Sequence, residues 1–193
     1  MAGVGVVQEL RMTLLAGALV AAVGMAGCGG GKERPATPQG FKRTETKYFA
    51  FAAPSGWRTE VRKPQQAQSP EELVAEAIGP AGTTGKQPDV VVGVTPRSGA
   101  SVEGLAQIQE LDGKTRFPGW KVTARKDADV AGADEGRLIE AQAPAEDGTP
   151  VRTYNLLAMS KDRTAVSMFV AVPAADVDRA RVHEILDSLE IRR

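Results

Sequence analysis

The rarest side chains of the sequence raise the possibility of metal chemistry first. The only histidine, His183, opens the stretch HEILD (residues 183–187), which begins like the helical zinc motif H-E-x-x-H. That motif needs two histidines one turn apart, and Asp187 stands where the second would be. One histidine and one cysteine in 193 residues are too few for a Cys/His zinc cluster. We therefore expect His183 to be a surface or edge residue of the last helix, and the sequence predicts no metal site and no cofactor.

Two loops resemble ligand-binding motifs but lack some of the residues that these motifs require. The stretch GPAGTTGK (residues 79–86) is spaced like a phosphate-binding loop, but Pro80 and Gln87 stand where glycine and serine or threonine are required. The stretch DADVAGADEG (residues 127–136) has the acidic density of a calcium loop, but Leu138 occupies the position of the bidentate glutamate. We expect a plain loop before a strand in the first case and an acidic turn between strands in the second.

The sequence contains few signals of a hydrolase or of a nucleic-acid-binding protein. Serine and lysine are plentiful, but no G-x-S-x-G elbow and no S-x-x-K pair is present. Basic and acidic residues both number 24, and the basic residues are dispersed among acids without interleaved aromatic side chains. We expect a protein that is not an enzyme and does not bind nucleic acid. An envelope hydrolase using serine and lysine remains the alternative.

Cys28, the only cysteine, lies between an apolar run (residues 12–27) and a glycine tract. The apolar run is shorter than the roughly 20 residues that a spanning helix needs, and it is typical of a signal-peptide core. The residues Met25-Ala26-Gly27-Cys28 resemble the lipobox of bacterial lipoproteins. That resemblance implies cleavage between Gly27 and Cys28, a diacylglyceryl group on the thiol of Cys28 and acylation, for example with palmitate, of the new amino terminus. The alternative is a buried helix with an inert cysteine.

The composition divides the chain into three parts. They are a lipoprotein signal peptide (residues 1–27), a lipidated cysteine with a flexible linker (residues 28–46) and a single domain (residues 47–193). The linker is rich in Gly, Pro, Thr and charge, and as a coil it would span about 23 Å. Four basic residues of the linker outnumber its two acids, which adds weak attraction to anionic lipid unless the linker is merely solubilising. They are Lys32, Arg34, Lys42 and Arg43.

Strand patterns dominate the domain. KYFAFAAP (residues 47–54) and WRTEVRK (residues 57–63) flank a Pro-Ser-Gly turn, which predicts a hairpin. Asp147-Gly148 predicts a second hairpin, and SKDRT (residues 160–164) predicts a turn between the next two strands. The second half of the domain is therefore expected to form an antiparallel meander, and Trp57 and Trp120 are expected in the core.

Two stretches have helical periodicity. Ser101 is a good cap for a helix over residues 101–117, and the chain end forms a second helix from near Asp176. The stretch SPEELVAEAIGP (residues 69–80) fits either a capped helix or a strand. The apolar stripes that should place both helices on a sheet are Val102, Leu105, Ile108 and Leu111 in the first, and Val182, Ile185, Leu186 and Leu189 in the second.

The YFAFAAPSGW stretch (residues 48–57), the order of the elements and the final ILDSLEI (residues 185–191) are similar to the PsbP-like α/β/α sandwiches. Within that group the chain resembles the LpqN/LpqT type of actinobacterial lipoprotein. The resemblance implies an α+β domain with an antiparallel sheet flanked by helices, and a non-enzymatic envelope protein. We expect the domain to be held on the extracytoplasmic face of the cell membrane by Cys28 and to bind an envelope protein or a small ligand. An accessory subunit of an envelope assembly is a further alternative.

Overall fold

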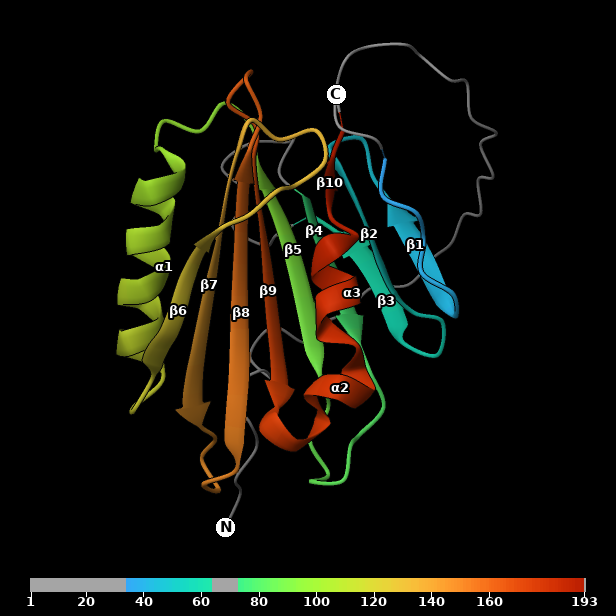
Figure 1. The fold of residues 1–193 in the computed structure, drawn as a ribbon, viewed down its shortest axis with the longest axis vertical. Coiled ribbons are helices and arrows are strands. Elements are labelled where there is room, and N and C mark those ends of the chain that lie inside the picture. Colours follow the sequence, from blue (N-terminus) through green and yellow to red (C-terminus); the bar gives the residue numbers. More distant parts are fainter. Residues whose placement is uncertain (1–33, 64–72, 193) are drawn as a thin grey trace. The chain divides into compact units, whose positions relative to one another are not determined.

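The computed structural model describes residues 34–63 and 73–192, all of which belong to one compact unit, Lys32–Arg193. Their centre is a seven-stranded sheet with the order β3-β4-β5-β9-β8-β7-β6, in which every neighbouring pair is antiparallel (Figure 1). Its strands are β3 (Arg58–Arg62), β4 (Leu73–Ile78), β5 (Asp89–Thr95), β6 (Lys121–Asp127), β7 (Glu135–Pro144), β8 (Pro150–Met159) and β9 (Ala165–Pro173).

The predicted meander is confirmed, because β6, β7, β8 and β9 pair in chain order. The Asp147-Gly148 turn joins β7 to β8, with Gly148 at a φ of 80°, and SKDRT joins β8 to β9. The acidic stretch connects β6 to β7, as expected. The ambiguous residues before Gly79 form strand β4 as far as the structure describes them, and the expected cap residues Ser69, Pro70 and Glu72 lie outside the described residues.

A second, three-stranded sheet has the order β1-β2-β10, with β1 (Phe41–Glu45), β2 (Phe49–Pro54) and β10 (Glu190–Ile191). The predicted hairpin between residues 47–54 and 57–63 is therefore wrong, because β2 and β3 belong to different sheets. Residues 49–53 are buried without alternation, as expected of a strand covered on both faces. The Pro-Ser-Gly turn carries the chain from one layer to the next instead of folding it back on itself.

The start of the domain also needs correction. Residues 41–45, which we assigned to the flexible linker, form β1 and pair with residues 50–54 of β2, from Phe41↔Pro54 to Glu45↔Ala50. Four of the five residues of β1 are charged or polar at exposed or half-buried positions, which makes the strand resemble a linker in the sequence. The buried ring of Phe41 and the backbone ladder hold this segment in the sheet.

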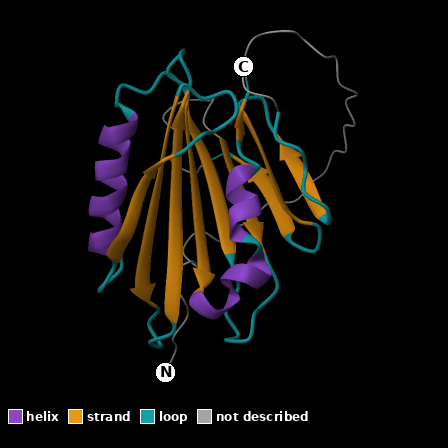
Figure 2. Cartoon of the chain, viewed as in Figure 1, coloured by secondary structure: helices purple, strands orange, loops and turns teal. Residues whose placement is uncertain are grey.

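Helices lie on opposite sides of the large sheet (Figure 2). Helix α1 (Val102–Arg116) packs on β7 and β8, and its cap is confirmed, since Ser101 Oγ accepts a hydrogen bond from the Gly104 N–H. On the opposite face, the small sheet and helices α2 (Val177–Ala180) and α3 (Val182–Asp187) enclose the main core. The expected α+β class, an antiparallel sheet flanked by helices, is confirmed.

The carboxyl-terminal helix is broken. A 3₁₀ turn, η2 (Ala174–Asp176), leads into α2, and Arg181 at a φ of 53° separates α2 from α3. The hydroxyl of Ser188 accepts a hydrogen bond from the Ala52 N–H at 2.8 Å, which ties the end of α3 to β2. All four apolar residues predicted for this helix are buried: Val182, Ile185, Leu186 and Leu189.

The stripe predicted for α1 is half wrong. Val102 is buried, but Ile108 and Leu111 are 58% and 68% exposed. The helix instead turns Ala106 and Gly113 toward the sheet, and the absence of a side chain at Gly113 lets the helix approach the indole of Trp120. Trp120 itself is buried, as expected, and its Nε1–H donates to Thr153 Oγ1 at 3.2 Å.

Candidate functional site

The residues proposed for processing and lipidation, Gly27 and Cys28, lie outside the described residues. So do the signal peptide and the first part of the linker.

The remaining chemical candidates occupy structural positions. His183 is exposed on α3, as expected, with its ring edge-on to Tyr154 at 6.1 Å between centroids. The stretch of residues 79–86 is a loop between β4 and β5, as expected, and Thr83 Oγ1 donates to the buried carboxylate of Asp176 at 3.3 Å. Among the described residues, no three His, Cys, Asp or Glu side chains gather in a way that could hold a metal ion.

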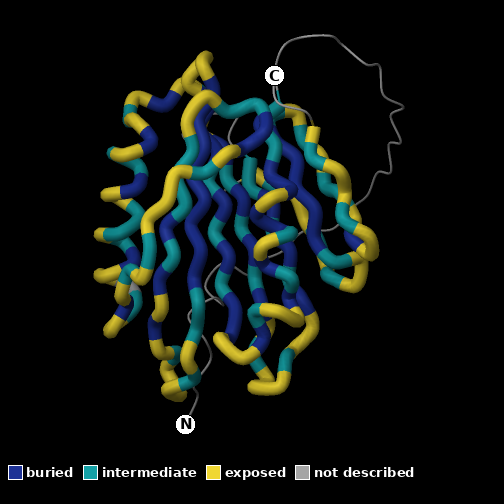
Figure 3. Tube along the Cα trace, viewed as in Figure 1, coloured by how far each residue is buried: buried dark blue, intermediate teal, exposed yellow. Residues whose placement is uncertain are grey.

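The two faces of the large sheet are covered unequally, and this difference identifies a candidate binding surface. Strand β8 is buried at every position from Thr153 to Met159, because it lies under α1 on one face and under the main core on the other. Strands β4, β5 and β9 instead alternate between buried and half-exposed residues (Figure 3). One face of these three strands therefore lies beyond the edge of α1.

Strand register shows that the half-exposed residues share this face. Val91 lies opposite Phe169 on β9 and opposite Glu76 on β4, and Phe169 lies opposite Asn155 on β8. Residues two positions along each strand point the same way. We call the resulting surface the open half-face and define its apolar part as Val74, Ile78, Val91, Phe169 and Ala171.

One flank of α1 borders the open half-face. Glu103 and Glu110, two turns apart, pair with Arg137 of β7 and Arg125 of β6, so their flank of α1 lies toward the β6 edge. Leu105 and Ile108 lie on the opposite flank, above the β8–β9 side of the sheet. Of these two residues, Leu105 packs against the buried cluster under the helix, whereas Ile108 is 58% exposed.

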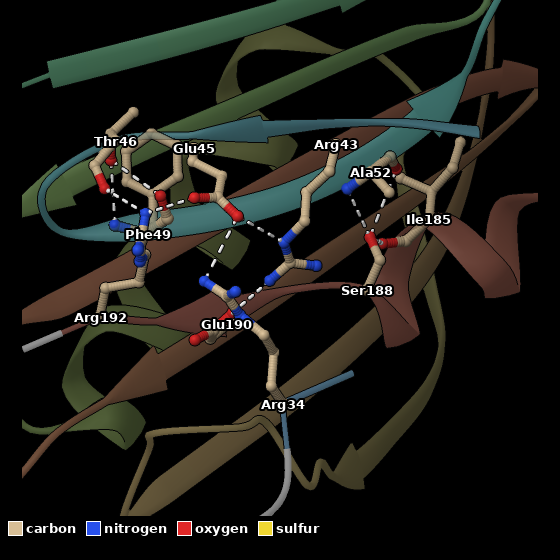
Figure 4. Close-up of polar contacts among 10 residues, drawn as sticks. All are labelled: Arg34, Arg43, Glu45, Thr46, Phe49, Ala52, Ile185, Ser188, Glu190 and Arg192. Carbon is tan, nitrogen blue, oxygen red and sulfur yellow. Dashed lines mark hydrogen bonds and ion pairs between the residues drawn. The ribbon is translucent and has the colours of Figure 1, made fainter. Parts of the chain in front are cut away.

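A second feature is an ion-pair network at the place where the linker joins the domain, which we call the tether junction (Figure 4). It contains Arg34, Arg43 and Arg192 around the carboxylates of Glu45 and Glu190. Arg34 Nε donates to Glu190 Oε2 at 3.1 Å and its Nη2 lies 3.3 Å from Glu45 Oε1. Arg192 Nη1 donates to Glu45 Oε2 at 2.9 Å.

The network holds the chain from residue 34 onward against the domain. The hydrogen bond to Glu190, followed by the charge of that carboxylate, raises the pKa of Arg34 above its ordinary value. The basic residues of the linker are evident from the sequence, but their acidic partners are not, because Glu190 is 156 residues from Arg34. The open half-face could not be predicted from the sequence either, because it depends on which strands α1 covers.

The layers and topology define a PsbP-like fold. The structure of the cyanobacterial PsbP protein CyanoP from Synechocystis matches with a TM-score of 0.55 at 11% identity, over 86% of this chain and 98% of that chain. LpqN of Mycobacterium tuberculosis, described as involved in cell envelope biogenesis, matches with a TM-score of 0.52 at 13% identity, over 79% of this chain and 86% of that chain. Neither the models of known families nor the sequences of curated proteins give a match.

Within the described part of the chain, no helix combines the length and the apolar character that crossing a membrane requires.

Proposed function

We propose that this protein is a lipid-anchored cell-envelope lipoprotein whose α+β domain binds an envelope protein through the open half-face, without catalysing a reaction. The observation that carries the binding role is the apolar surface of β4, β5 and β9 that α1 leaves uncovered. Partly buried apolar side chains that share one uncovered sheet face, here interspersed with Glu76 and Asp89, mark a candidate partner site. The likeness in fold to LpqN supports an envelope role by analogy.

The anchor is proposed from the residues Met25-Ala26-Gly27-Cys28 and the polar tract that follows them. Two acyl chains give stable attachment, since each buried methylene contributes about 0.8 kcal/mol. The mature chain would then start at Cys28 and remain on the extracytoplasmic face of the membrane.

Processing tests the anchor. Cys28→Ala should leave an unprocessed precursor without an acyl group, whereas globomycin should leave a precursor that carries the diacylglyceryl group but is not cleaved, as measured by mass spectrometry of the extracted protein. The matched variant Cys28→Ser separates loss of the thiol from loss of its size. A chain of mature mass that stays in the membrane fraction without Cys28 would contradict lipid anchoring.

Site-specific photocrosslinking tests the binding face. A benzoylphenylalanine at Phe169 or Val91 should give a crosslinked product of defined mass in intact cells. The same probe at Leu111, exposed on the outer side of α1, is the control. Equal crosslinking at all three positions, or crosslinking at Leu111 alone, would contradict binding through the open half-face.

A further inference from the structure

The tether junction contains more positive than negative charge. Among the described residues, the three guanidinium groups of Arg34, Arg43 and Arg192 face two carboxylates, which leaves an excess of one positive charge. Lys47, exposed in the turn between β1 and β2 and two residues after Glu45, adds a further positive charge. The junction therefore favours an anion.

Two of the three arginines are accessible and keep donors for an additional ligand. Arg34 is about half exposed and uses Nε and Nη2 in the ion pairs described, so its Nη1 group has no partner within residues 34–63 and 73–192 and can donate to a ligand. Arg192 is also partly exposed and uses Nη1 toward Glu45 and the Thr46 carbonyl. The forked donors of arginine match the oxygens of a phosphate group.

Arg43 lies behind them. Its side chain is 12% exposed, and its Nη1 is buried without a hydrogen-bond partner among the described residues. Arg43 pairs with both Glu45 and Glu190, so these two carboxylates do not fully balance the charges of Arg34 and Arg192 as well. An anion held by the two accessible arginines would balance the remaining charge without having to reach Arg43 itself.

Chain length brings the junction close to the proposed anchor. Arg34 is six residues beyond Cys28, and six extended residues span at most about 20 Å. The ion pairs that fix Arg34 to Glu45 and Glu190 make the effective tether much shorter than the linker of residues 28–46 expected from composition. The end of the domain that carries β10 and the β1–β2 turn must therefore stay near the bilayer.

We propose that the tether junction binds the phosphate group of an anionic membrane lipid through Arg34 and Arg192. This rests on the proposed lipid anchor for its setting, and it adds a defined orientation: the β1–β2 turn faces the bilayer while the domain is held by both the acyl chains and the headgroup contact.

The test uses a chain that begins at Gly29 and so carries no acyl group. All buried core residues in the described part of the chain lie within residues 41–191, inside the compact unit Lys32–Arg193, and circular dichroism verifies that the shortened chain is folded. Flotation at low ionic strength should show binding to phosphatidylcholine vesicles that contain phosphatidylglycerol and not to phosphatidylcholine alone. Arg34→Gln/Arg192→Gln should weaken binding about 30-fold, since each basic residue near the surface contributes about a factor of five.

The matched control is Arg58→Gln/Lys121→Gln, which removes the same charge from the exposed starts of β3 and β6. This variant should bind within about twofold of the parent chain. An equal loss in both variants would mean diffuse attraction and would overturn the site, as would equal binding to neutral vesicles.

Inorganic phosphate separates the two sources of the same chemistry. If free phosphate raises the melting temperature through Arg34 and Arg192 while the anionic vesicles do not bind, the junction is a phosphate site and the lipid assignment is wrong. Because this chain lacks Cys28, each of these outcomes is independent of the acylation measured on Cys28→Ala.

Discussion

The two faces of the seven-stranded sheet differ in how completely they are covered. On one face the small sheet, α2 and α3 enclose a continuous core that includes Phe49, Phe51 and Met168. On the other, α1 covers β7 and β8, while Val91 and Phe169 remain only partly buried. The covered face contains the larger buried core, and the open half-face leaves apolar area partly accessible to solvent.

The largest difference between the two faces is expected in the stability of paired phenylalanine variants. Phe51→Ala removes a fully buried ring and should lower the free energy of unfolding by about 4 kcal/mol. Phe169→Ala on the half-exposed surface should cost only about 1 kcal/mol, because less apolar area leaves water there on folding. Urea unfolding of the Gly29–Arg193 chain measures both. Equal losses would show that the open half-face is covered in the free protein.

Two glycine variants of α1 test how closely the helix packs on the sheet. A Cβ at Gly113 would lie 2.7 Å from Trp120, so Gly113→Ala should destabilise by about 2 kcal/mol despite the better helix propensity of alanine. At Gly104 the nearest atom is Ser101 Oγ at 3.4 Å, and Gly104→Ala should be neutral or stabilising by up to about 1 kcal/mol. Thermal or urea unfolding compares the two, and a stable Gly113→Ala variant would mean that α1 does not pack closely on Trp120.

Local signals in the sequence predicted local structure well. The Ser101 cap, the Asp147-Gly148 turn and the apolar residues of α3 depend on neighbours within a few positions, and all three are confirmed. Such features need only turn chemistry and periodicity.

Assignments that depend on distant contacts could not be made in the same way. Whether β2 pairs with β3 depends on which layer each strand joins, and the predicted hairpin is wrong for that reason. Ile108 fits an apolar stripe by spacing, but the approach of Gly113 to Trp120 rotates it outward. The tether junction required Glu190 from the far end of the chain, so the linker boundary was placed too late.

The smallest expected effect concerns the polar flank of α1, which ties the helix to β6. Glu110 accepts two hydrogen bonds from Arg125, from Nε at 2.5 Å and Nη2 at 2.6 Å. These bonds lower the pKa of Glu110 below its ordinary value of 4.5, against the opposing effect of burial. Stability from this pair is therefore present above about pH 4.5 and is lost as the pH falls through the lower folded pKa.

Glu110→Gln should thus cost about 0.5 kcal/mol near neutral pH, because Arg125 is half exposed and solvent screens the pair. The difference between variant and parent should shrink as the pH falls below the folded pKa of Glu110, measured as urea midpoints across an acid series. Glu146→Gln, exposed in the β7–β8 turn, removes the same charge without a paired arginine and is the control. A cost of several kcal/mol for Glu110→Gln alone would mean that ion pairs hold α1 on the sheet. In that case these ion pairs, and not the packing of Gly113 against Trp120, would determine where the helix lies. They would also determine how much of the sheet remains uncovered as the open half-face.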